Sequence, residues 1–160
     1  MRWRVIIKLI VLYIIIFLST FAHEFGHIMM AKIFYNVKNC RIEIGVGKNI
    51  LKLKKFIVRV LPAYGVAYWE FKDWDSYRKS SKLRKIMPCI GGPLVSLLIT
   101  LGFILISGNN YGDFYNQIIK YFIMYNSICF ISTILPIKYI NYSSDGMCIF
   151  DIIRDNKVEK

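Results

Sequence analysis

The chain of 160 residues carries a formal net charge of +12, from 22 Lys and Arg against 10 Asp and Glu, and 56% of its residues are hydrophobic. This balance is too apolar for a typical soluble domain and indicates a single unit that resides in a lipid bilayer. A basic chain can also bind nucleic acid, but thirteen of the Lys and Arg fall within residues 38–85. Basic residues concentrated in one segment are typical of a membrane protein, whose cytoplasmic segments are basic. We therefore expect the lipid bilayer as a partner and no nucleic acid.

Three apolar runs are long enough to cross a membrane. They cover residues 5–31, 89–107 and 118–137, and each is close to the ~20 residues that a helix needs to span the hydrocarbon layer. The first run is too long for a signal peptide and lacks a small-residue cleavage site, so we expect it to be retained. The sequence therefore predicts three transmembrane helices, over about 5–34, 88–107 and 117–136.

Between the first two helices the pattern changes to that of a sheet. Apolar and polar residues alternate over 42–46 and 56–60, with glycines and a proline between the runs. This predicts a small β-meander over about 40–71, with strands of about 4–6 residues lying against the membrane. The tail predicts a short amphipathic helix over about 146–155. The expected fold class is a mainly α membrane protein of one domain, 1–160, with three transmembrane helices and a membrane-associated β-meander between helices one and two.

The charges also predict the orientation of the chain. The short loop 108–116 contains no Lys or Arg and one acid, whereas residues 38–85 hold thirteen basic residues. Basic segments stay in the cytoplasm, so we expect the N-terminus and the 108–116 loop outside and the C-terminus inside. Three basic residues near the N-terminus oppose this orientation but are outnumbered. We expect an integral protein of a bacterial cell membrane.

Four cysteines, at positions 40, 89, 129 and 148, show no paired CxxC spacing. We expect small apolar residues with free thiols, because nothing in the spacing predicts a disulfide framework or a cysteine metal site.

The two histidines of the chain, His23 and His27, flank Glu24 in the pattern HEFGH inside the first predicted helix. Residues four apart share a helix face, so both imidazoles can bind one metal ion. Zinc is the usual metal for such a pair; it activates a water molecule and polarises a carbonyl, while Glu24 acts as the general base. The pattern also occurs by chance on surface helices, but ionisable groups are costly to bury in a membrane helix and indicate function there. His23 lies ~27 Å along the helix from residue 5, which places the site near the cytoplasmic face.

A catalytic zinc ion needs a third protein ligand, and no other histidine exists. Glu43 is one alternative, but it alternates with apolar residues in a predicted strand, which is typical of a solvated face. Asp113 falls on the wrong side of the membrane, and the aspartates at 151 and 155 fit the polar face of the last helix. We favour Asp145, which follows the third helix on the same side as His23; its alternative role is a helix N-cap.

Four motifs occur in order along the chain, and two of them contain His23, Glu24, His27 and Asp145. They are HEFGH at 23–27, LPAYGVAYW at 61–69, IGGPLVSLL at 90–98 and SDG at 144–146. With the predicted topology, they make the sequence resemble the site-2 protease-like intramembrane zinc metalloproteases in their minimal three-helix core form. Ser96 and Thr133 stand where that family commonly has asparagines.

The resemblance implies an intramembrane endopeptidase with His23, His27 and Asp145 as zinc ligands and Glu24 as the catalytic residue. It also implies a membrane-spanning or membrane-associated peptide as the substrate, which the β-region holds in an extended form. Two other function classes remain: a chaperone or immunity protein of the same fold that binds without proteolysis, and a metal transporter or sensor. The metal transporter or sensor is disfavoured because three short helices offer little pathway for an ion and no second polar helix face.

Overall fold

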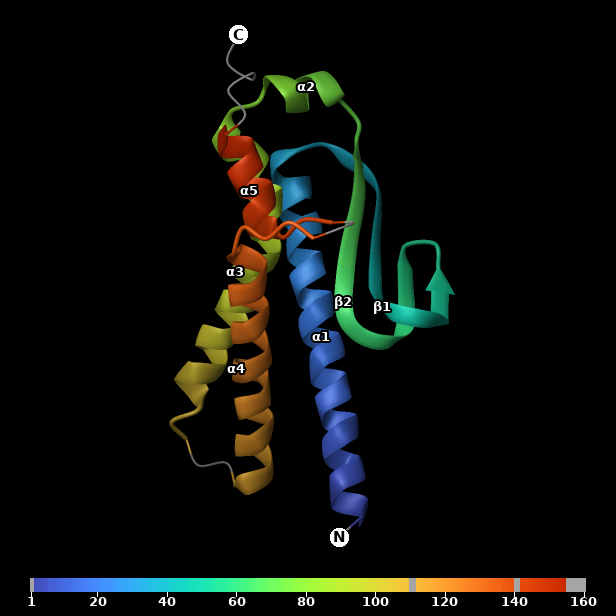
Figure 1. The fold of residues 1–160 in the computed structure, drawn as a ribbon, viewed down its shortest axis with the longest axis vertical. Helices are drawn as coiled ribbons and strands as arrows, with labels where there is room; N and C mark the ends of the chain where they lie inside the picture. Colours follow the sequence, from blue (N-terminus) through green and yellow to red (C-terminus); the bar gives the residue numbers. More distant parts are fainter. Residues whose placement is uncertain (1, 110–111, 140–141, 155–160) are drawn as a thin grey trace.

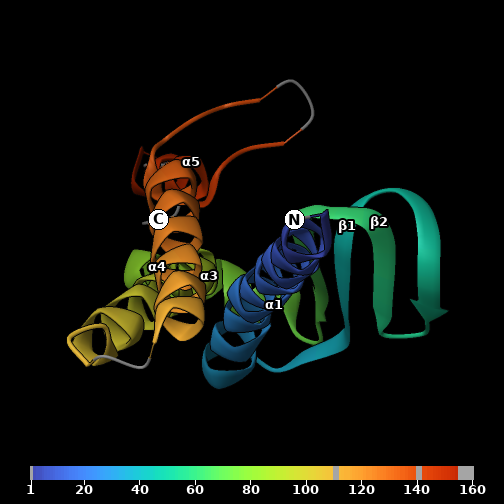
Figure 2. The same cartoon turned by 90° about the horizontal axis from the view of Figure 1, so that it is seen from below.

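The computed structural model describes residues 2–109, 112–139 and 142–154. Figure 1 shows the elements in chain order: α1 (Arg2–Phe34), β1 (Val37–Leu53), β2 (Phe56–Phe71), α2 (Trp74–Lys79), α3 (Lys82–Ile106), α4 (Asp113–Ile134) and α5 (Asp145–Arg154). The sheet lies on one side of α1, and α3 and α4 lie on the other (Figures 1 and 2). The short helix α5 packs on α3 at the end of the molecule where α1 ends.

Two helices of the described chain are long and apolar enough to cross a membrane, by length and composition. They are α1, over Val5–Phe34, and α3, over Lys82–Ile106. The third predicted span, α4, has 22 residues and packs against both, and its crossing of the membrane stays a prediction. The structure therefore has a mainly helical fold with two candidate membrane spans.

The crossing of α1 and α3 depends on glycine. A Cβ atom on Gly26 would collide with the carbonyl oxygen of Gly91, and one on Gly91 would collide with that of Gly26. Small residues let helix backbones approach closely inside a membrane, where packing rather than the hydrophobic effect holds helices together. This contact places the HEFGH segment of α1 directly against the Gly-Gly-Pro segment of α3.

The sheet consists of two long antiparallel strands rather than the short strands of 4–6 residues that we predicted. Ile42, Glu43 and Ile44 of β1 have strand partners on both sides, so β1 is central and the 65–67 segment of β2 lies at one edge. Positive φ angles of 93° at both Gly45 and Gly47 let β1 bend without ending.

A small core forms between α1 and this sheet. It consists of Ile28, Ile42 and Ile44, packed against Phe17, Phe21 and Phe56. It fixes the sheet against the face of α1 next to the one that carries the histidines.

The second long helix begins six residues earlier than the predicted position 88. The hydroxyl of Ser81 accepts a hydrogen bond from the backbone N–H of Arg84 and caps the helix. The apolar run in the sequence covers only the apolar part of this helix, so the basic first turn was missed and Pro88 lies inside the helix.

Candidate metal centre

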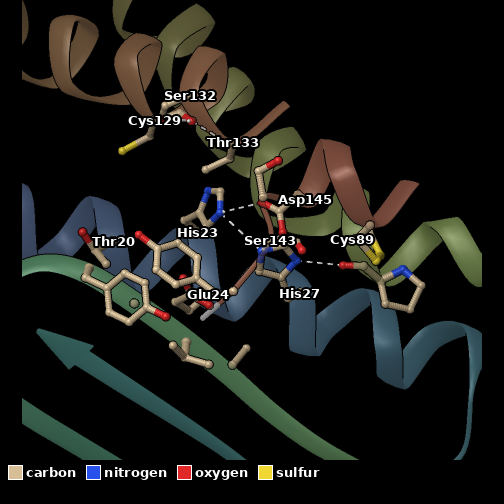
Figure 3. A pocket seen from close by; sticks show the side chains of 18 of the residues that line it. Thr20, His23, Glu24, His27, Cys89, Cys129, Ser132, Thr133, Ser143 and Asp145 are labelled. Carbon is tan, nitrogen blue, oxygen red and sulfur yellow. Dashed lines mark hydrogen bonds and ion pairs between the residues drawn. A yellow bond between two sulfur atoms is a disulfide. The ribbon is translucent and has the colours of Figure 1, made fainter. Parts of the chain in front are cut away.

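Three ligand-type side chains meet between α1 and α5. The Nε2 atoms of His23 and His27 lie 3.3 Å apart, on successive turns of α1. The carboxylate of Asp145 bridges them, with Oδ2 3.3 Å from Nε2 of His23 and Oδ1 3.4 Å from Nε2 of His27 (Figure 3). The two histidines are buried and Asp145 is half-buried, so the group is shielded but reachable.

Asp145 is available for this contact because its neighbour caps the helix. The hydroxyl of Ser144 accepts a hydrogen bond of 3.1 Å from the backbone N–H of Met147, which is the N-cap role that the sequence left open for Asp145. Burial raises the pKa of the Asp145 carboxyl, but its hydrogen bonds with His23 and His27 outweigh burial and hold that pKa below its usual range. Asp145 is therefore an anion at neutral pH.

Each histidine is oriented through its other ring nitrogen. Nδ1 of His27 lies 2.7 Å from the carbonyl oxygen of Pro88, which can only accept, so Nδ1 donates to it and the ring turns Nε2 toward Asp145. Nδ1 of His23 lies 2.9 Å from the hydroxyl of Ser96. Such partners fix the tautomer and ring orientation of metal-binding histidines.

The donor set fits a metal ion. The ligand atoms of His23, His27 and Asp145 all lie within 4.8 Å of one another, and two imidazoles with one carboxylate are typical of zinc in catalytic sites. The space beside them is kept open by Gly92, where a Cβ atom would collide with Nε2 of both histidines. The group can therefore hold one ion with a coordination position left over.

Glu24 lies on the side of the site that faces the sheet (Figure 3). It is buried, at 7% exposure, and its carboxylate lies close to the backbone of Ala67 in β2. The strand can come this close because Gly65 has no side chain, since a Cβ atom there would lie 2.6 Å from Cγ and Oε1 of Glu24. Glu24 is thus held between the metal ligands and the edge of the sheet.

A single cavity of about 540 Å³ connects these groups. Its walls come from α1, the 63–71 segment of β2, Tyr77 of α2, α3, α4, residues 139 and 142–143, and the start of α5. Aromatic side chains line much of it, and His23, Glu24, His27 and Asp145 open into it. The arrangement can hold a metal ion, a general base and an extended peptide segment side by side.

The other acids of the described chain do not join this group. Our interpretation of Glu43 as part of a solvated face was wrong, because it is buried and ion-paired to Arg41 at 2.9 Å and to Arg59 at 2.5 Å. Two arginines are the reason that a carboxylate is tolerated there. Asp113 and Asp151 are exposed, and the aspartate at 155 lies outside the described residues.

Two features of the site had no clear signal in the sequence. Cys89 and Cys148 form a disulfide with a Cα–Cα distance of 6.5 Å, so the expectation of four free thiols was wrong; only Cys40 and Cys129 are free. Ser96, noted as a departure from the family pattern, is buried against His23 rather than placed toward a substrate. Both features depend on which helices meet, and residue spacing does not reveal that.

The comparisons with known proteins agree with the geometry. No curated protein matches the chain, but the family model described as peptidase family M50 matches residues 11–151. That match covers most of the chain and includes all four residues of the site. The chain therefore belongs to peptidase family M50, the site-2 protease family of membrane-associated zinc metallopeptidases.

Proposed function

We propose that this protein is a membrane-embedded zinc endopeptidase that hydrolyses a peptide bond in a membrane-spanning or membrane-associated peptide. One observation carries the proposal: a single cavity brings His23, His27 and Asp145 together with Glu24 and the edge of a β-strand. Family membership supports the peptidase class. The geometry supports the assignment of roles to individual residues.

The two histidines and Asp145 would hold the zinc ion. When bound at such a site, zinc lowers the pKa of a water ligand and polarises a carbonyl group. Pro88 and Ser96 keep the two imidazoles turned toward Asp145, so the ligands are preorganised before the ion arrives.

Glu24 would act as the general base and then as the general acid. Its carboxylate takes a proton from the attacking water and returns it to the leaving amine. The close approach of Gly65 and the neighbouring backbone of Ala67 hold the carboxylate beside the strand. Its position between the ligands and β2 is where a peptide bond held along that strand would lie.

The 65–67 segment of β2 would bind the substrate. One side of this segment pairs with β1, and the other side faces the cavity. A sheet edge binds extended peptide by backbone hydrogen bonds, and only an unwound segment exposes its peptide bonds to attack. Two hydroxyls of α1 hold the bend that precedes the segment: Tyr13 donates to the carbonyl of Val60 and Thr20 to that of Pro62, each at 3.1 Å.

Replacing Glu24 with glutamine tests the proposal. The change keeps the size of the side chain but removes the base, so proteolysis stops while the zinc ligands stay intact. We expect new peptide termini, identified by mass spectrometry of membrane fractions, in cells that make the wild-type protein and not in cells that make Glu24→Gln. Purified Glu24→Gln should retain zinc.

The matched control is Glu70→Gln, the same change at an exposed carboxylate of β2 whose side chain is 57% accessible. It should leave the new termini in place. If Glu24→Gln yields the same termini as the wild type, the protease assignment fails and a binding or chaperone role of the same fold becomes the better explanation.

A further inference from the structure

A buried lysine lines the cavity from the first turn of α3. Lys85, in the first turn of α3, is only 6% exposed and lines the same cavity as the metal ligands and Glu24. The surface of the protein carries many lysines, but this one is enclosed. Burying an ammonium group costs free energy unless it is paired. The contacts of Lys85 therefore indicate its role.

The partners of Lys85 within the described chain leave its charge uncompensated. Its Nζ atom donates to the carbonyl oxygen of Arg78 at 2.8 Å, and it lies 5.7 Å from the centre of the Tyr77 ring. No carboxylate of the residues that the structure describes lies within 4.0 Å of it. An ammonium group has three N–H donors, so it has capacity left for an anion from outside the chain.

Lys85 lines the same cavity as β2, the strand that we propose holds the substrate. Seven residues of helix, about 10 Å, separate Lys85 from Gly92, which touches the metal ligands. Strand β2 runs along the cavity as well: Gly65 lies beside Glu24, and Phe71, six residues or about 20 Å further along the strand, stacks on Tyr77 with ring centres 4.3 Å apart. An extended peptide advances about 3.3 Å per residue. A peptide along β2 would therefore reach Lys85 about three to six residues from the scissile bond, three by the length of helix α3 and six by the length of the strand.

We propose that Lys85 is a substrate-binding residue that pairs with a carboxylate of the peptide, about three to six residues from the bond that is cut. The carboxylate is an Asp or Glu side chain or the terminal carboxylate of the peptide. This inference rests on the proposed function, because it uses β2 as the strand that holds the substrate. It adds a specificity rule: the preferred peptide carries a negative charge at one defined distance from its cleaved bond.

Peptide binding to the uncleaving protein tests the rule. The protein is the zinc-loaded Glu24→Gln chain in detergent micelles, and the probes are apolar octapeptides that carry an uncharged fluorophore and are read by anisotropy. One series is amidated at its C-terminus and carries a single Glu or Gln at each position in turn. A second pair contains no acidic side chain and ends in a free carboxylate or an amide. The first series reports a side-chain carboxylate and the second a terminal one.

We expect at least one charged probe to bind about tenfold or more tightly than its neutral counterpart, as for an enclosed charge pair. Adding Lys85→Gln should remove that difference, because glutamine keeps a donor for the Arg78 carbonyl but has no charge. Adding Lys85→Arg should retain it. Lys79→Gln removes the same charge from an exposed position outside the cavity and should also retain it.

The inference is overturned if every charged probe binds with the same affinity as its neutral counterpart. It is also overturned if none of the probes binds measurably. A preference that survives Lys85→Gln with unchanged zinc content overturns it too. These outcomes are separate from failure of the proposed function, which appears as continued cleavage by Glu24→Gln.

Discussion

At the scale of single residues, the candidate centre depends on which atoms are already engaged. Ser144 caps α5 and leaves Asp145 free to face the histidines. Pro88 and Ser96 engage the Nδ1 atoms, so the Nε2 atoms face Asp145. A metal site needs ligand atoms that point to one place, and here a neighbour orients each ligand.

Asp145 would bind the metal ion, whereas Ser96 only orients His23, so mutations at these two positions should lower zinc affinity by different amounts. Asp145→Ala removes a proposed ligand and should abolish stoichiometric zinc binding. Ser96→Ala leaves the ligands but releases the His23 ring, and should weaken zinc binding by about 10- to 100-fold. Competition with a chromophoric chelator measures both. Asp151→Ala, an exposed acid six residues along the same helix, and Ser107→Ala, an exposed hydroxyl of the α3 cap, should match the wild type.

Zinc affinity should fall further in Asp145→Ala than in Ser96→Ala. Full zinc occupancy in Asp145→Ala would assign the third ligand to another residue. A Ser96→Ala chain with unchanged affinity would show that packing alone orients His23.

At the scale of elements, helix α5 is tied to α3 at both of its ends. Cys148, one turn after Asp145, is bonded to Cys89, which follows the Pro88 that orients His27. Near the other end, Nζ of Lys82 donates to the carbonyl of Ile153 at 3.0 Å. Covalent and polar contacts thus hold the helix that carries Asp145 against the helix that orients the histidines.

The disulfide should make the stability of the protein sensitive to reductant. The two cysteines are 59 residues apart in sequence, and the chain-entropy model assigns about 4 kcal/mol to closing a loop of that length. Reduction should therefore lower the Tm of the detergent-solubilised protein. It should have no effect on the Cys89→Ser/Cys148→Ser double variant, whose Tm should equal that of the reduced wild type.

Alkylation provides the direct check. The unreduced, denatured chain should accept label at two cysteines, Cys40 and Cys129, and at all four after reduction. Four labelled cysteines without reductant would disprove the bond.

The elements also show what the sequence could reveal. Histidines four residues apart must share a helix face, so their proximity followed from the pattern alone. The helices were detectable because a membrane span requires a long apolar run. The disulfide and the pairing of Glu43 with two arginines were not detectable, because they depend on tertiary approach. Strand lengths were wrong because Gly45 and Gly47 bend β1 where a turn was expected to end it.

At the scale of the whole molecule, charge and shape agree. The start of α1 and the start of α4 lie at one end of the long axis, and α2 and α5 lie at the other (Figure 1). The basic cluster of Arg78, Lys79, Lys82 and Arg84 surrounds α2 and the start of α3. The metal ligands lie in the same half of the molecule, since His23 and His27 are in the C-terminal half of α1.

This polarity predicts how the protein is oriented in the membrane. Basic segments resist translocation, and thirteen Lys and Arg at 38–85 outweigh the three near the N-terminus. The C-terminus and the cavity should therefore face the cytoplasm, with the N-terminus outside. An epitope at the N-terminus should be digested when protease is added to intact spheroplasts. The same epitope at the C-terminus should survive until the membrane is opened. Protection of the N-terminal epitope under the first condition would reverse the orientation, and Lys85 would then meet its carboxylate on the outer face.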